Sequence, residues 1–137
     1  MALYLIDTNI LAALSKPTPA RTVERKVTKR LGEMVIAATV LHEMWFGIER
    51  LPQSRRRAQL ERFMGEFVAP LRVLPYGERA ARWHASERAR LGAVGRAVDF
   101  ADGQIAAVAA VQDAILVTAN VGHFEVFEGL RVENWLT

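Results

Sequence analysis

The sequence predicts a single α/β domain, with a mainly parallel sheet of four to five strands covered by helices on both faces. Short aliphatic runs alternate along the chain with longer segments in which apolar residues recur at helical spacing. The first two of these runs are apolar throughout, as strands buried on both faces of a parallel sheet are. A chain of 137 residues can build one core of its own, so we assign residues 1–137 to one domain.

The predicted strands are three to five residues long and rich in apolar side chains. In order they are Tyr4–Ile6, Met34–Ala37, Leu71–Pro75, Ile115–Thr118 and, as a fifth candidate, Leu130–Val132. Polar and apolar residues tend to alternate in the third, which is typical of a strand with one exposed face.

The helices predicted between these strands end at turn-forming residues. A short helix stops at the proline-containing loop Ser15–Pro19, and another begins with Thr39 as its N-cap and stops before Pro52. The segment Phe100–Val111 is apolar on several sides, which indicates a buried helix. The short helix before Ser15 is Ile10–Leu14, predicted from a run of apolar residues, and the other helices, predicted from amphipathic spacing, are Arg21–Leu31, Gln53–Phe67 and Glu78–Leu91.

The composition excludes several kinds of site. The chain has no cysteine, so it forms neither disulfides nor thiolate metal sites. We expect a cytoplasmic protein that does not enter a membrane, because no signal peptide opens the sequence and its apolar runs are too short to span a bilayer. Fifteen arginines stand against three lysines. That bias suits bidentate contact with phosphate, but a preference for arginine codons explains it equally well.

Three carboxylates occur at predicted strand-to-helix junctions. Asp7 ends the first strand, Glu43 lies in the first turns of the helix after the second, and Asp102 opens the helix that leads to the fourth. In a parallel sheet such junctions share one edge, so these acids are expected to converge. Crowded carboxylates repel unless a cation is present, and Mg²⁺ or Mn²⁺ prefers oxygen ligands of this kind. Such a site is suited to phosphodiester hydrolysis.

Each acid also has a structural explanation. Asp7 is a good N-cap, Asp99 with Asp102 resembles an N-cap and its N3 acid, and Glu43 alone would usually be solvated. The histidines His42, His84 and His123 lack partners at ligand spacing and are interpreted as structural or surface residues. Core packing is the default for three aromatic residues, with a protein-binding groove as the alternative: Trp45, Phe46 and Trp83. Arg55–Arg57 is most simply a solvated helix start.

Four segments of the chain form a recognisable series: "YLIDTNIL", "TVLHEMWFGIERL", "GRAVDFADGQIAA" and "ILVTANVGHFEVFEGLRVENW". Together they resemble the PIN-domain ribonucleases, and within them the VapC-type toxins of bacterial toxin–antitoxin pairs. "YLIDTNIL" resembles the opening D-T-N strand end of that family, and "TVLHEMWFGIERL" is similar to an E-x-x-x-G helix with Glu43 as its acid. "GRAVDFADGQIAA" is similar to the block whose acid here is Asp102. "ILVTANVGHFEVFEGLRVENW" resembles the closing segment. The resemblance covers nearly the whole chain.

The resemblance implies a PIN-like α/β/α sandwich and a metal-dependent endoribonuclease. It implies that Asp7, Glu43 and Asp102 bind Mg²⁺ or Mn²⁺ and that nearby polar groups support them: Thr8, Asn9 and Thr118. Relatives carry Asp or Asn at the position of Asn120, so either Asn120 or Asp99 fills the fourth position. The implied partners are an RNA substrate, a small cognate antitoxin of the VapB kind and a second copy in a homodimer.

Two other hypotheses remain open at the level of sequence. An aspartyl-phosphate phosphatase of the haloacid-dehalogenase type also begins with an Asp at the end of a first strand. Its motif requires a second Asp two residues later, where this chain has Asn9. A PIN-like module that binds RNA or protein without catalysis is the other, and it is favoured only by Asn120.

Overall fold

A computed structural model describes residues 2–137, which form five parallel strands between two layers of helices. The strand order is β3-β2-β1-β4-β5. The strands are β1 (Tyr4–Ile6), β2 (Met34–Ala37), β3 (Arg72–Leu74), β4 (Ile115–Val117) and β5 (Arg131–Glu133). The α/β prediction with a parallel sheet is therefore confirmed, with the fifth strand displaced by one residue.

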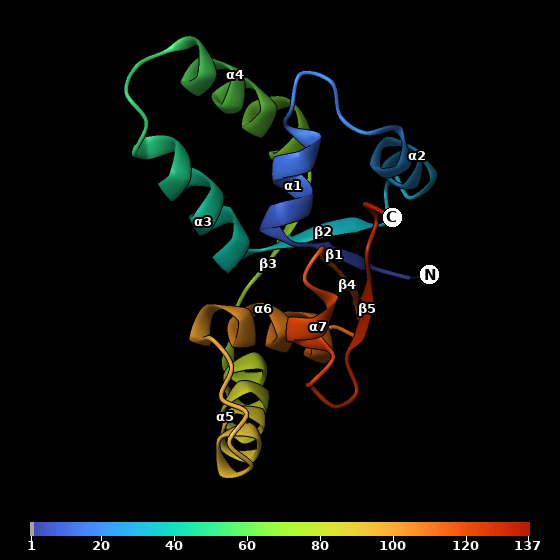
Figure 1. The fold of residues 1–137 in the computed structure, drawn as a ribbon, viewed down its shortest axis with the longest axis vertical. Helices are drawn as coiled ribbons and strands as arrows, with labels where there is room; N and C mark the ends of the chain where they lie inside the picture. Colours follow the sequence, from blue (N-terminus) through green and yellow to red (C-terminus); the bar gives the residue numbers. More distant parts are fainter. Residues whose placement is uncertain (1) are drawn as a thin grey trace.

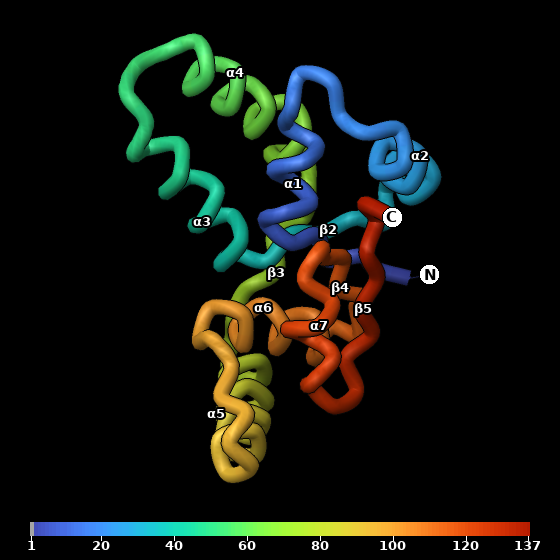
Figure 2. The backbone as a smooth tube through the Cα atoms, viewed as in Figure 1, coloured from blue at the N-terminus to red at the C-terminus, as the bar shows by residue number. Residues whose placement is uncertain are grey.

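The helices divide between the two faces of the sheet. Figure 1 shows the first four above the strands and the last three below them. Above are α1 (Thr8–Leu14), α2 (Arg21–Lys29), α3 (Ala38–Glu49) and α4 (Arg55–Phe63), continued by a π-helical turn, η1 (Met64–Val68). Below are α5 (Glu78–Ala93), α6 (Phe100–Val111) and the short α7 (Val121–Phe124). Figure 2 shows that the chain crosses from the first layer to the second as it leaves β3.

The order in which successive strands are added to the sheet reverses beside β1. The chain moves outward through β2 and β3, and then returns through α5 and α6 to place β4 on the other side of β1. Open α/β sheets bind their ligands at such a switch point, outside the carboxyl ends of the strands. Asp7 and Thr118 follow the two strands that flank it, and the Asp7 N–H donates to the Val117 carbonyl at 2.9 Å.

The core lies on both faces of the three central strands. All residues of β1, β2 and β4 are buried, as continuous apolar runs predict. Helix α6 is buried on several sides, also as predicted. Near the C-terminus, Trp135 is 1% exposed and packs against Tyr4 with ring centroids 5.4 Å apart. No helix within residues 2–137 is long and apolar enough to cross a membrane.

Several predicted boundaries were wrong, each for a local reason. Helix α3 begins at Ala38, so Thr39 is not its N-cap, and the buried Thr39 hydroxyl has no hydrogen-bond partner in the described chain. The predicted helix Gln53–Phe67 begins only after Ser54, whose side chain accepts from the Arg57 N–H at 3.2 Å, and it ends in the π-helical turn. The four-residue helix α7 was not predicted, because so short an element has no periodicity to detect.

Candidate active site

Asp7 lies at the switch point and is almost fully buried, with 5% of its surface exposed. It is the N-cap of α1, and its Oδ1 accepts the Thr8 N–H at 2.7 Å. Its Oδ2 accepts the hydroxyl of Thr118 at 2.8 Å and the side-chain amide of Asn9 at 3.4 Å. Burial raises the pKa of Asp7, and these three hydrogen bonds oppose the rise. Asp7 therefore caps a helix and presents a carboxylate at the strand ends at the same time.

Thr118 and Asn9 hold that carboxylate in one orientation. The Thr118 hydroxyl donates to Asp7 and accepts from the Asn9 amide at 3.2 Å and from the Asn120 N–H at 3.1 Å, so its hydrogen-bonding capacity is filled. The Asn9 carbonyl in turn accepts the Ala119 N–H at 3.0 Å. This network joins α1 to the segment after β4. Because the Asn9 side chain is committed to it, the position gives no support to the phosphatase hypothesis, which needs a free acid there.

Glu43 and Asp102 lie within the electrostatic field of Asp7. Glu43 is exposed, as a solvated helix residue would be. Partial burial of its carboxyl still raises its pKa, the charges of Asp7 and Asp102 raise it further, and the neighbouring His42 lowers it. Burial also raises the pKa of Asp102, together with the charges of Asp99 and Asp7. The two helices concerned, α3 and α6, are in contact. Three junctions far apart in sequence therefore bring their acids to one edge of the sheet, as predicted from their positions.

Asp99 and Asn120, the two candidates for the fourth position, differ in their contacts and in their effect on the neighbouring acids. Asp99 occupies the N-cap position of α6 but forms no capping hydrogen bond, so the predicted capping interaction is absent within residues 2–137. Its charge instead raises the pKa values of Asp102 and Glu43. Asn120 is exposed and begins α7, where its backbone N–H, not its side chain, contacts Thr118. Asp99 therefore acts on the neighbouring acids through its charge.

His123 is an exposed surface residue, as predicted, but it also contacts one of the candidate acids, which the sequence did not reveal. Its Nδ1 lies 3.6 Å from Asp102 Oδ2, and this contact lowers the pKa of Asp102. The sequence held no signal for it, because the histidine lies on the unpredicted α7. The other two histidines are structural or surface residues, as predicted. His42 is exposed and stacks on Phe46 with centroids 6.2 Å apart, and His84 is buried between α5 and α6.

The donor chemistry of the site fits a hard divalent cation. Every predicted ligand is a carboxylate, and the repulsion among them is what such a cation would relieve. The Thr8 hydroxyl adds a buried oxygen that has no hydrogen-bond partner in the described chain. Within residues 2–137, however, no three His, Asp or Glu side chains are arranged to hold an ion as they stand. The residues therefore fit a divalent cation by the chemical type and the negative charge of their donor atoms, and not by a ready-made coordination geometry.

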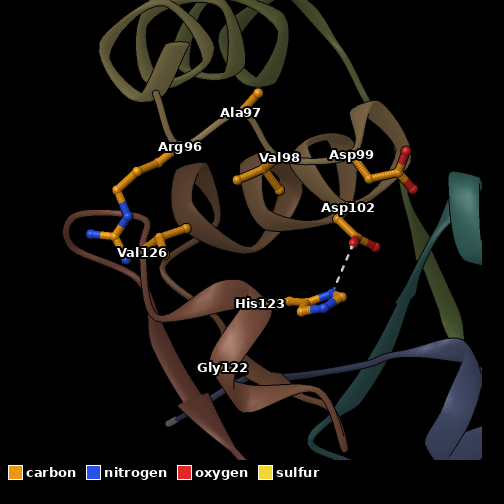
Figure 3. A pocket seen from close by; sticks show the side chains of 8 residues that line it. All are labelled: Arg96, Ala97, Val98, Asp99, Asp102, Gly122, His123 and Val126. Carbon is orange, nitrogen blue, oxygen red and sulfur yellow. Dashed lines mark ion pairs between the residues drawn. The ribbon is translucent and has the colours of Figure 1, made fainter. Parts of the chain in front are cut away.

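Two surface hollows adjoin the acids. One has a volume of about 320 Å³ and is lined by Asp99 and Asp102 together with Arg96 and His123 (Figure 3). The other has a volume of about 480 Å³, lies among α1, α3 and α4, and includes Thr8 and Glu43. Its rim carries three cationic residues: Lys16, Arg50 and Arg56.

The surface around α3 differs from the default prediction. Trp45 and Phe46 are 39% and 54% exposed, so core packing was wrong for both, and exposed aromatic residues commonly mark interfaces. Core packing is confirmed for Trp83, which packs against Phe127 with centroids 5.7 Å apart. In the arginine run, Arg57 binds the Leu51 carbonyl at 2.9 Å and pairs with Glu49, so this residue is structural and not merely solvated.

Comparison with known proteins finds a matching family model, related sequences and similar solved structures. The model of the PIN domain matches residues 4–128. The chain is 33% identical to the tRNA(fMet)-specific endonuclease VapC of Shigella flexneri, over 98% of this chain and 99% of that protein. It is similar to the crystal structure of DNA-bound VapBC from Salmonella typhimurium, with a TM-score of 0.86, 28% identity, and 98% and 99% of the two chains covered.

A second solved structure has the same fold. It is VapBC-5 from Mycobacterium tuberculosis, described as a member of the VapBC family of toxin-antitoxin systems. The TM-score is 0.75 at 27% identity, and 98% of each chain is covered.

Proposed function

The chain belongs to the PIN-domain family, and from this premise we propose that it is a divalent-metal-dependent endoribonuclease and the toxin of a toxin–antitoxin pair. The observation that carries the proposal is the meeting of three acids at the switch point of the sheet, where the charge of Asp7 raises the pKa of both Glu43 and Asp102 and the charge of Asp102 raises that of Glu43. Acids whose pKa values are shifted by burial and by neighbouring charges beside a cleft are typical of functional sites.

The proposed ligands of Mg²⁺ or Mn²⁺ are Asp7, Glu43 and Asp102, with Asp99 as the supporting fourth acid. When bound, such an ion neutralises charge on a phosphodiester and makes an attacking water more acidic. The Thr8 N–H and the Thr118 hydroxyl fix the direction in which the Asp7 carboxylate points. Such outer hydrogen bonds usually matter to a site nearly as much as its ligands do.

The proposed partners follow from the same site and its surroundings. RNA is the substrate class, consistent with the arginine and lysine side chains on the rim beside Glu43. A small antitoxin protein is the proposed inhibitor, and the exposed Trp45 and Phe46 on α3 offer it an aromatic surface. A homodimer and a cytoplasmic location stay predictions.

A second candidate function is a PIN-like module that binds RNA or protein without catalysis. The observation that favours it is the lack, within residues 2–137, of a group of three side chains already arranged around an ion, together with Asn120 in place of an acid. Isothermal calorimetry with Mn²⁺ separates the two. Heat of binding that is lost in Asp102→Asn supports the nuclease, and no binding at millimolar Mn²⁺ supports the module.

The proposed function is tested by cleavage of total RNA with Mg²⁺ or Mn²⁺ and with a chelator. We expect the wild type to cleave only with metal and Asp7→Asn to be folded and inactive. Asp113→Asn is the matched control, because Asp113 is exposed at the other end of α6 and its positive φ of 53° is one that Asn also tolerates. Full cleavage by Asp7→Asn in the presence of metal would overturn the assignment.

A further inference from the structure

The pocket between the α5–α6 connection and α7 is lined by one of the proposed metal ligands, Asp102. Its volume is about 320 Å³, and Asp102 belongs both to its lining and to the proposed metal ligands. A ligand that fills this pocket would therefore lie beside the phosphate being cleaved. The volume is within the range usual for small-molecule subsites, which begins at about 300 Å³.

The lining changes character from one end of the pocket to the other. Figure 3 shows Asp102 and His123 at one end, Arg96 beside Val126 at the other, and Val98 between them. Val98 and Val126 are half-buried and give the middle of the pocket an apolar wall. An acidic end, an apolar middle and a cationic end match a nucleotide bridging from the reaction site, because a nucleotide joins a flat apolar base to an anionic phosphate.

Arg96 is available to a ligand in a way that its neighbour Arg90 is not. Arg90 is committed to Glu87 through two hydrogen bonds of 2.8 and 2.9 Å and to the Val126 carbonyl at 3.0 Å. Arg96 is exposed, and none of the ion pairs within residues 2–137 involves it. A guanidinium without a carboxylate partner at the end of a pocket is suited to a phosphate.

We propose that this pocket is the subsite for the nucleotide next to the scissile phosphate. Arg96 binds a backbone phosphate of that nucleotide, and Val98 and Val126 pack against its base or sugar. This inference rests on the proposed ribonuclease function, and it names the part of the chain that positions the substrate. RNA is favoured over a protein occupant because the pocket shares Asp102 with the reaction site and ends in an unpaired cation.

The test separates binding from cleavage by using the inactive Asp7→Asn background. A fluorescein-labelled, single-stranded RNA of mixed sequence is titrated with Asp7→Asn, with Asp7→Asn/Arg96→Ala and with Asp7→Asn/Arg25→Ala, and fluorescence anisotropy is measured at several salt concentrations. Arg25 is the matched control, because it is an exposed arginine on α2, outside the pocket. Both substitutions remove the same charge.

We expect Arg96→Ala to weaken RNA binding about tenfold, which corresponds to the roughly 1.4 kcal/mol of one charge-assisted contact. The slope of log K against log salt should become shallower by about 0.7, the value for one phosphate contact on a single strand. Arg25→Ala should change neither quantity. Arg96→Lys should keep the salt slope and recover only part of the affinity, since lysine lacks the planar fork of arginine.

Kinetics of the cleaving enzyme provide a second readout. In the wild-type background Arg96→Ala should raise KM about tenfold and leave kcat unchanged, as expected for uniform binding of ground state and transition state. Equal losses of affinity in the Arg96 and Arg25 variants would overturn the subsite. Unchanged RNA affinity in Arg96→Ala would also overturn it and leave the pocket to a protein partner. A wild type that binds RNA without cleaving it would refute the proposed function, while the binding titrations would still decide the subsite.

Discussion

Gly103 is the residue whose substitution tests the packing beneath the acids most directly. It follows Asp102 in α6, and a Cβ atom added there would lie 2.2 Å from His84 Nε2 and 2.7 Å from His84 Cδ2. The imidazole cannot easily move away. It is 3% exposed, its Nδ1 is hydrogen-bonded to the Tyr76 hydroxyl at 2.8 Å, and the Phe100 ring lies 4.8 Å from it.

Two opposing effects set the magnitude for Gly103→Ala. Overpacking a filled core costs about 1–3 kcal/mol, and a methyl group this close to a held ring belongs at the upper end of that range. Alanine in place of glycine within a helix returns about 1 kcal/mol. The clash is the larger of the two, so we expect the free energy of unfolding to fall by about 2 kcal/mol. Cleavage should fall as well, because the displaced turn carries Asp102.

Urea denaturation followed by circular dichroism measures this change. Gly47→Ala is the matched control: Gly47 lies within α3, and a Cβ there would have no atom outside its own helix within 4 Å. It should gain up to about 1 kcal/mol. In a His84→Ala background, which itself is less stable, Gly103→Ala should cease to destabilise, so the two substitutions should couple by at least about 1 kcal/mol. Stabilisation by Gly103→Ala alone, equal to that of Gly47→Ala, would refute the reasoning.

Three further substitutions test the electrostatics of the site and of its supporting layer. Thr118→Val removes a hydroxyl that donates to the buried Asp7 carboxylate, so the free energy of unfolding at neutral pH should fall by about 1.5–3 kcal/mol in urea denaturation. Asp102 has a pKa raised above its ordinary value of 3.8, so its contribution to stability is present below that pH and is lost as pH rises through the raised value. In metal-free thermal melts the stability of Asp102→Asn relative to wild type should therefore increase as pH rises from 4 to 7. Hydrogen bonds from Arg90 lower the pKa of Glu87 below 4.5. The contribution of Glu87 to stability is therefore present above pH 4.5 and is lost as pH falls through the lowered value. Arg90→Ala should reduce this loss of stability at acidic pH, which we call the acid limb.

Each of these has a control and a contradicting result. Thr28→Val removes an exposed hydroxyl that bonds only to the Glu24 carbonyl and should change stability by less than about 0.5 kcal/mol, so an equal effect at Thr118 would contradict the first prediction. A stability difference for Asp102→Asn that does not vary with pH would contradict the second. Arg82→Ala removes an exposed arginine from the same helix as Arg90, and an unchanged acid limb in Arg90→Ala would contradict the third.

The sequence by itself determined the fold class, the strands and the three junction acids. These could be read because strand burial, helical spacing and capping are local properties of the chain, and because equivalent junctions of a parallel sheet share one edge. Asp7, Glu43 and Asp102 could thus be grouped before any contact was known. The sequence failed at Thr39, whose hydroxyl is buried without capping α3, and at α7, which is too short to show a period.

Only the tertiary structure decided how the site is completed. The hydrogen bond from Thr118 to Asp7, the contact of His123 with Asp102 and the packing of Gly103 on His84 all join separate elements. Such contacts depend on how helices are placed over the sheet, which no local pattern encodes. The exposure of Trp45 and Phe46 was decided in the same way, since the same aromatic spacing suits either a buried or an outward helix face until the neighbouring helices are in place.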